Sequence, residues 1–295
     1  MAVTSEIDGS ADASGANFAE LRSPSFFRVV PVTVVKDIRL NLRYMPDLAG
    51  RIAEIAIRVL FFWIFANAIS IRADYSPLGQ AITGRDLVVY FQGALALFVF
   101  NNVALSAPVN AVNRDLYNGT LEYLFICPSS RYAYFVGTVA ASAIVSLSVF
   151  VPVFLILVWS SGTGLIDVVM ILCVCLLVLC TIVAFGILIA LMAILWRQVG
   201  FITSVLAILF EMLSGAYFPI SVLPRQLQDL ALLLPYTWGY DLIRYYSFRG
   251  RWTPLFPVAV EWAALVAFAI VFAWISRVLL KMAEHAAKRA GFNVI

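Results

Sequence analysis

The sequence is poor in charge and in the residues that build catalytic or metal centres. Only 13% of its 295 residues are Asp, Glu, Lys or Arg, about half the share found in an ordinary soluble domain. Lysine occurs three times and histidine once, at His285. The shortage of charge excludes a soluble enzyme, and with one imidazole the four cysteines lack partners for a metal site. Cys173, Cys175 and Cys180 share one apolar run, where we expect them to be small buried packing residues.

Apolar residues dominate the composition instead. Hydrophobic side chains make up 63% of the chain, and the mean hydropathy is +0.95, which excludes a disordered or fibrous protein. The formal net charge of +3 is too small to indicate nucleic-acid binding, so we expect no nucleic-acid partner. The composition therefore predicts a protein embedded in a lipid bilayer.

Six segments are apolar enough to predict membrane-spanning helices, which need about 20 such residues. They are residues 52–71, 87–109, 133–159, 166–196, 200–214 and 256–280. The fifth is short for a span. The predicted fold class is an all-α polytopic membrane protein with six transmembrane helices within residues 49–285.

An even number of spans places both termini on one side of the membrane. Of the 20 Lys and Arg residues, 13 fall on the side of the termini and six on the other, with Arg58 inside the first span. Because cytoplasmic loops carry the excess of positive residues, the termini are expected in the cytoplasm. The membrane is expected to be the plasma (inner) membrane.

The N-terminal region divides into two parts. Residues 1–24 are acidic rather than basic and apolar, so they predict a disordered cytoplasmic tail and not a signal peptide; residues 286–295 are expected to form a second tail. Apolar residues recur every three or four positions within 25–48, which predicts an amphipathic helix at the membrane interface. Its cations would face anionic lipid: Arg28, Lys36, Arg39 and Arg43. The alternative is a helix docked on a neighbouring protein surface.

The cytoplasmic segment between the second and third spans, residues 111–131, has pronounced turn chemistry. Asn118 and Gly119 form a turn signal, Thr120 can cap a following short helix, and Pro128 ends it. This segment is either a connecting loop or a contact for a soluble partner.

Prolines interrupt the apolar segment on the outer side. Pro219, Pro224 and Pro235 divide residues 215–246 into two helical pieces, 223–233 and 238–245, each too short to cross a bilayer. Such half-length helices predict a re-entrant hairpin, which needs protein or water around its backbone. The alternative is an amphipathic loop resting on the outer membrane surface.

A few polar residues lie inside the predicted spans, where each charge is costly. Glu54 and Arg58 are four residues apart on one helix face and are expected to neutralise each other. Asn101 and Asn102 either pack against a neighbouring helix or line a polar path. Glu211 has no cation one turn away and is a candidate for the translocation path.

Two motifs in this order resemble the membrane subunits of type-2 ABC exporters, and they look closer to the drug and lipid branch than to the polysaccharide branch. They are GTLE at 119–122 with its following Pro128, and SGAYFPISVLP at 214–224 with the later Pro235 and Arg244. The resemblance implies a permease that pairs as two copies and docks two nucleotide-binding subunits. By position, it implies that the coupling region contains Arg114, Asp115, Gly119, Thr120, Leu121, Glu122 and Pro128. It implies likewise that the outer re-entrant gate contains Gly215, Phe218, Pro219, Pro224, Pro235 and Arg244.

The residues agree that energy comes from another chain. A phosphate-binding P-loop needs a glycine before its lysine, and none of the three lysines follows a glycine. We therefore expect no enzyme activity and no cofactor on this chain, with ATP and Mg bound by a partner ATPase subunit. The predicted function is export of an amphipathic small molecule or a lipid. The alternatives are export of polysaccharide or lipid-linked glycan, and an ion-driven secondary transporter or channel.

Overall fold

The structure is a computed structural model that describes residues 26–43, 45–70, 76–79, 81–117, 119, 131–195 and 200–290. Helices make up nearly all of these ranges, which confirms the predicted all-α class. They are α1 (Phe26–Arg43), α2 (Met45–Ala68), α3 (Gly84–Tyr117), α5 (Arg131–Ser161), α6 (Leu165–Leu195), α7 (Gly200–Leu213), the 3-10 turn η3 (Ile220–Val222), α8 (Arg225–Leu232), α9 (Pro235–Ser247) and α10 (Val258–Ala290).

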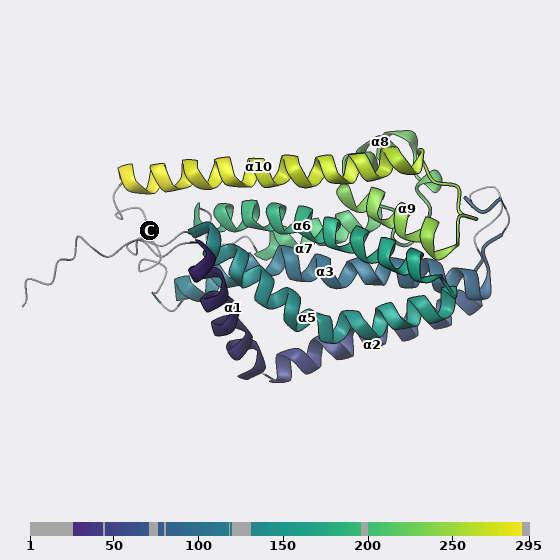
Figure 1. Cartoon of the computed structure of the whole chain (residues 1–295), viewed down its shortest axis with the longest axis horizontal. Coiled ribbons are helices and arrows are strands. Elements are labelled where there is room, and N and C mark those ends of the chain that lie inside the picture. The colour runs from purple at the N-terminus through teal and green to yellow at the C-terminus, as the bar shows by residue number, and fades with distance from the viewer. Residues whose placement is uncertain are drawn as a thin grey trace, which may run out of the picture.

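The long helices run alongside one another and form an elongated bundle (Figure 1). α3 is central and packs against α5, α6, α2, α9 and α7. α10 packs against α6 and α9. α1 crosses the bundle steeply at the end where α10 also finishes, whereas α8 and α9 lie at the opposite end.

Each of the six predicted spans coincides with a helix, but only some meet a strict criterion for crossing a membrane. Among the described residues, three helices are long and apolar enough: Ala133–Ser161 in α5, Leu165–Ile187 in α6 and Val258–Leu279 in α10. α2 and α3 have 24 and 34 residues, and at 1.5 Å per residue reach about 36 and 51 Å, more than the hydrocarbon thickness of about 30 Å. α7 has only 14 residues, about 21 Å.

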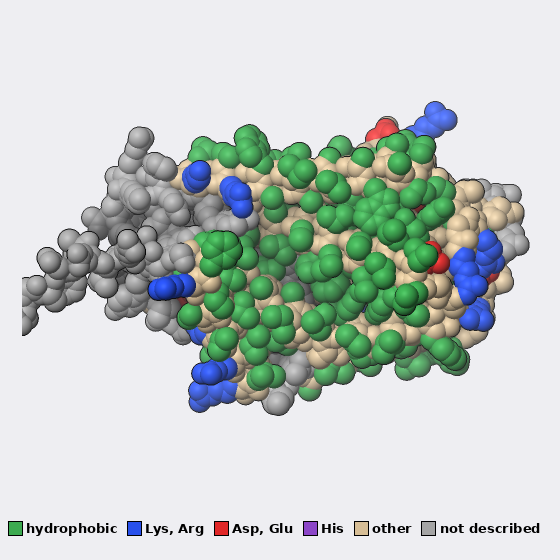
Figure 2. All heavy atoms as spheres, viewed as in Figure 1, with side chains coloured by type: hydrophobic (Ala, Val, Ile, Leu, Met, Phe, Trp, Pro, Cys, Tyr) green, Lys and Arg blue, Asp and Glu red, His purple; other side chains and the backbone are tan. Residues whose placement is uncertain are grey.

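The surface reflects a lipid environment. Figure 2 shows hydrophobic side chains over the middle of the visible face, with Lys and Arg gathered toward its two ends. Ile270, Val271 and Trp274 of α10 are exposed. The expectation that the cysteines are buried is right for Cys175 and wrong for Cys173 and Cys180, which are exposed on α6. The physical reason is that apolar residues of a membrane helix are as stable against lipid as in a protein core, so an apolar run does not predict burial.

Two helix boundaries differ from the sequence expectation. α1 ends at Arg43 and α2 begins at Met45, so the last residues of the expected interface helix belong to the next helix. α3 continues to Tyr117, so the first part of the expected 111–131 loop is helical. The continuation places Arg114 in the last turn of α3.

Small residues allow α9 to insert deeply between other helices. A Cβ at Gly239 of α9 would lie 2.6 Å from Val178 of α6, and a Cβ at Gly93 of α3 would lie 3.1 Å from Ile243 of α9. Ten of the 13 residues of α9 are buried. This amphipathic-looking segment is therefore part of the core of the bundle.

Candidate functional site: two arginine clusters and the base of α3

The first cluster surrounds Arg58 on α2 and joins it to α7. The Nη2 atom of Arg58 lies 3.3 Å from Oε1 of Glu54, which confirms the predicted i,i+4 pair. The Nη1 atom lies 3.9 Å from Oε2 of Glu211 and donates to the Tyr217 hydroxyl at 3.4 Å. The guanidinium also lies over the Phe98 ring of α3, with Cζ 3.8 Å from the ring centroid.

Glu211 is buried inside this cluster. The Tyr217 hydroxyl donates to Glu211 Oε2 at 2.6 Å. A phenol has an ordinary pKa of about 10 and therefore carries a proton to donate at neutral pH. The sequence showed no cation near Glu211, but the fold brings Arg58 to it from 153 positions earlier in the chain. Arg58 and Tyr217 thus both hold the carboxylate, and the exposed part of the cluster is the Glu54–Arg58 pair on α2.

The second cluster surrounds Arg244 on α9, which is buried. Its Nη2 atom donates to the carbonyl oxygens of Gly215 at 2.7 Å and Ala216 at 3.1 Å. The guanidinium lies over the Tyr90 ring of α3, with Cζ 3.6 Å from the ring centroid, and Cζ is 5.6 Å from the Trp252 ring. Carbonyl dipoles and aromatic faces therefore replace water around this cation.

Gly215 connects α7 to the second cluster. Its φ is +82°, and a Cβ there would lie 2.9 Å from Cγ1 of Ile220, so both the backbone conformation and the space require glycine. Its carbonyl accepts hydrogen bonds from Arg244 and from the Tyr90 hydroxyl at 3.0 Å. The turn that ends α7 is thereby fixed to α3 and α9.

The prolines of the predicted re-entrant segment each precede or begin a helical piece. Pro219 precedes η3, Pro224 precedes α8, and Pro235 is the first residue of α9. The ring of Pro235 suits the first turn because no backbone donor is needed there, so α9 begins three residues earlier than predicted. Phe218 lies in the turn between α7 and η3, and is half-buried.

Sequence reasoning missed two buried carboxylates beside the Arg244 cluster. Asp241 of α9 accepts hydrogen bonds from Trp252 Nε1 at 2.6 Å and from the Leu255 amide at 2.7 Å. Glu261, in the first turn of α10, accepts one from the Phe256 amide at 3.1 Å. Both carboxylates hold the connection between α9 and α10, residues 248–257, in place. The local sequence signal for this role was Glu261, an acidic residue in the first turn of a helix.

A third cluster fastens the end of α3 to α1 and α5. The Nη2 atom of Arg114 donates to Oδ1 of Asp37 at 3.0 Å. The Tyr134 hydroxyl of α5 donates to Oδ2 of Asp115 at 2.5 Å. Arg114 and Asp115, two residues expected in the coupling region, therefore join three helices.

α1 is docked on α5 along one face. A Cβ at Gly137 of α5 would lie 2.7 Å from Thr33, so the helices are in close contact. Lys36 lies over the Tyr134 ring, 5.3 Å from its centroid, and 3.7 Å from Asp37. The other expected lipid-facing cations are exposed: Arg28, Arg39 and Arg43. One face of α1 thus packs against α5 of the same chain, while the face that carries these arginines is exposed, so the interface helix and the helix docked on a neighbouring protein both stay predictions.

Several predicted site residues lie outside the described residues. For Thr120, Leu121, Glu122 and Pro128 this holds for the whole residue, and for Asn101 and Asn102 it holds for the side chain. Gly119 is described, with a φ of +65° and open space around it. Its conformation agrees with the turn signal in the sequence.

The helical bundle, its apolar surface and its helix-joining polar clusters define a multi-pass membrane protein. Residues 40–248, more than half of the chain, match the family model described as ABC-2 type transporter. The chain belongs to this family and is a transmembrane subunit of an ABC transporter, a permease component that is not itself catalytic. Such permeases generally work with a partner ATPase. No curated protein matches the sequence.

Proposed function

We propose that this chain is half of the transmembrane part of an ATP-driven exporter in the plasma (inner) membrane, with both termini cytoplasmic. Two copies form the translocation path by this proposal, and two ATPase subunits bind ATP and Mg at the cytoplasmic end. All six predicted segments then cross the membrane, and residues 215–246 form the outer re-entrant gate. The cargo is an amphipathic small molecule or a lipid, as the family resemblance of the GTLE segment favours.

The observation that carries this proposal is the exposed ion pair on α2. Glu54 and Arg58 lie near the middle of the helix, and their side chains are 47% and 32% exposed. Charges facing hydrocarbon near the bilayer centre cost about 2.5–3.5 kcal/mol each on insertion scales. Such a pair is stable when it is shielded from lipid, either by a second copy of the chain or by a water-filled path. A translocation path between two copies provides both the second copy and the water.

The cluster at the end of α3 supports coupling to a partner. Arg114 and Asp115 lie directly before Gly119 and the GTLE segment, and they bind α1 and α5. A displacement of the GTLE segment by an ATPase would therefore move three helices together. α1 moves with them, and its exposed cations rest on anionic headgroups.

Cross-linking tests the pairing of two copies. Ile57, three residues from Glu54 on α2, and Ile270 on α10 are matched isoleucines, 66% and 64% exposed. With the four native cysteines replaced by serine, I57C is expected to give a disulfide-linked dimer in membranes and I270C to give monomer. Dimer at position 270 with monomer at position 57 would contradict the proposed path.

Reconstitution tests the energy source and the cargo. The full chain with its co-purifying ATPase is expected to hydrolyse ATP in proteoliposomes, faster with tetraphenylphosphonium or added phospholipid. Stimulation by undecaprenyl-linked sugars alone would move the assignment to glycan export. Gradient-driven flux through the chain without any ATPase would establish a secondary transporter or channel instead.

A further inference from the structure

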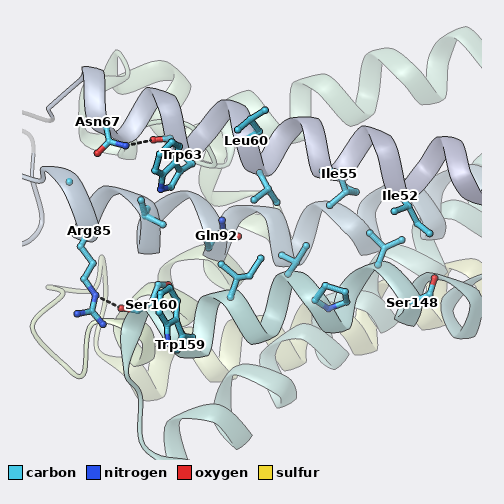
Figure 3. A pocket seen from close by; sticks show the side chains of 18 residues that line it. Ile52, Ile55, Leu60, Trp63, Asn67, Arg85, Gln92, Ser148, Trp159 and Ser160 are labelled. Atoms are coloured by element: carbon cyan, nitrogen blue, oxygen red, sulfur yellow. Dashed lines mark hydrogen bonds between the residues drawn. The ribbon is translucent and has the colours of Figure 1, made fainter.

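A long groove on the other flank of α2 carries none of the functions assigned above. It lies between α2, α3 and α5 and has a volume of about 860 Å³, within the range of small-molecule sites. Its length is lined mainly by apolar side chains such as Ile55, Val59, Val149 and Val153 (Figure 3). Glu54 and Arg58 are not among the residues that line it, so the groove is separate from the charged cluster.

One end of the groove is polar and aromatic. Figure 3 shows Arg85, Trp63, Trp159 and Asn67 at the same end, where α3 begins and α2 and α5 finish. The Nε atom of Arg85 donates to the Ser160 carbonyl at 2.6 Å, which anchors the guanidinium at this mouth. Within the described part of the chain, its terminal nitrogens have no hydrogen-bonding or ionic partner. Tryptophans beside a cation are typical of the level of lipid headgroups.

A single buried acceptor marks a point deeper in the groove. Gln92 lines the groove and is 2% exposed, yet its Oε1 atom has no hydrogen-bond partner among the described residues. An unpaired buried acceptor is costly and favours a ligand that brings a donor. Gln92 is seven residues after Arg85 on α3, which corresponds to about 10 Å along the helix.

We propose that this groove binds an anionic lipid with a hydroxylated acyl chain. The phosphate pairs with the terminal nitrogens of Arg85, the chain follows the apolar walls, and a hydroxyl near the start of the chain donates to Gln92 Oε1. Charge complementarity at the mouth favours lipid over a second copy of the chain, and the unpaired Gln92 Oε1 selects the hydroxyl. Binding at this site requires neither ATP nor transport, so it stands apart from the proposed export.

Two lipids that differ by the hydroxyl test the role of Gln92. The probes are dimyristoyl phosphatidic acid and phosphatidic acid with two 3-hydroxymyristoyl chains, titrated onto the full chain in detergent and quantified by native mass spectrometry. The wild type is expected to bind the hydroxylated lipid about five-fold more tightly, which corresponds to the net contribution of one hydrogen bond. Q92M should bind both lipids equally, whereas Q226M, a matched change on exposed α8, should keep the preference.

A second set of variants tests the mouth and the walls. R85Q is expected to weaken both phosphatidic acids about ten-fold, because a charge-assisted pair is lost, while R225Q on α8 changes nothing. A56F fills the groove from the exposed face of α2 without touching Arg85 or Gln92, and it should weaken both lipids even if Q92M fails to fold.

Three results would overturn the proposal. They are equal wild-type affinity for the two lipids, a hydroxyl preference that survives Q92M, and native affinity of both lipids for A56F. If A56F instead dissociates a dimer while lipid affinity is unchanged, the groove is covered by a second copy and the lipid assignment is wrong.

Discussion

The Arg244 and Arg58 clusters both stabilise a charged guanidinium among membrane helices, but they do so with different partners. Arg244 is 4% exposed, and two carbonyl groups and three aromatic rings of its own chain surround it. Arg58 is paired with two carboxylates, and one side of its cluster stays open. The Arg244 cluster is closed by its own chain, although Arg244 Nε has no hydrogen-bond partner among the described residues, whereas the Arg58 cluster is open on one side.

We predict that this difference separates a structural role from a functional one. A cation enclosed by its own chain stabilises the fold and is not accessible to a partner. A half-exposed ion pair in an apolar surface needs a partner or water, and intramembrane charges of this kind commonly mark transport paths. Substitutions in the Arg244 cluster should therefore reduce stability, and substitutions in the Arg58 cluster should reduce transport beyond their effect on stability.

The largest expected effect is at Arg244. R244M leaves the Gly215 and Ala216 carbonyls without their charged donor, and two such hydrogen bonds are together worth about 3 kcal/mol or more. We expect a large drop in thermal unfolding temperature and in yield, measured by intrinsic tryptophan fluorescence in detergent. R244K should recover only part of the loss, since an ammonium cannot stack on Tyr90 and hold two carbonyls at once. Native stability of R244M would remove the distinction between the clusters.

Arg58 is expected to show a smaller loss of stability with a larger loss of activity. R58M leaves the buried Glu211 carboxylate with Tyr217 as its donor, at a cost of about 2 kcal/mol, less than for a fully enclosed pair. The double variant R58M/E211Q should regain most of that stability and none of the ATP-dependent transport. R225M, at an exposed position on α8, is the control and should change neither. If the double variant transports at the wild-type rate, the Arg58 cluster has only a structural role, like the Arg244 cluster.

Gly215 tests the turn that joins α7 to the closed cluster. G215A forces a Cβ into a positive-φ position and within 2.9 Å of Ile220, with an expected cost of about 1–2 kcal/mol. G250A, also at a positive φ but with 3.7 Å to its nearest neighbour, should cost about 1 kcal/mol, the backbone part alone. Thermal unfolding separates the two effects, and equal costs would mean that the contact with Ile220 relaxes freely.

The smallest effect on stability is expected at Asp37, at the opposite end of the bundle. D37N weakens a partly exposed ion pair with Arg114, worth about 0.5–1 kcal/mol. If the cluster couples α3 to the ATPase, D37N should nevertheless uncouple ATP hydrolysis from transport. R39Q, on the exposed side of α1, is the control and should leave the ratio of transported cargo to hydrolysed ATP unchanged. If D37N also leaves this ratio unchanged, the Asp37–Arg114 pair only holds α1 in place.

Local spacing made some of these features predictable. The Glu54–Arg58 pair follows from one helical turn, the breaks at Pro219, Pro224 and Pro235 follow from the missing backbone donor, and the helical class follows from composition. Arg244 and Gly215 were marked by the family resemblance. Their contact could not be deduced, because 29 residues and three turns separate the guanidinium from the carbonyl that it binds.

What the sequence by itself determined is therefore the bilayer, the helices and the places where helices break, since hydropathy and backbone chemistry act over a few residues. Only the tertiary structure decided which polar groups meet, such as Glu211 with Arg58 and Arg114 with Asp37. It also decided that the Gln92 Oε1 atom is buried beside a groove without a partner among the described residues. The reason is physical. Lipid tolerates apolar residues on every face of a helix, so the apolar pattern does not specify how membrane helices are rotated or which faces touch, and the polar partners become known only when the helices are packed.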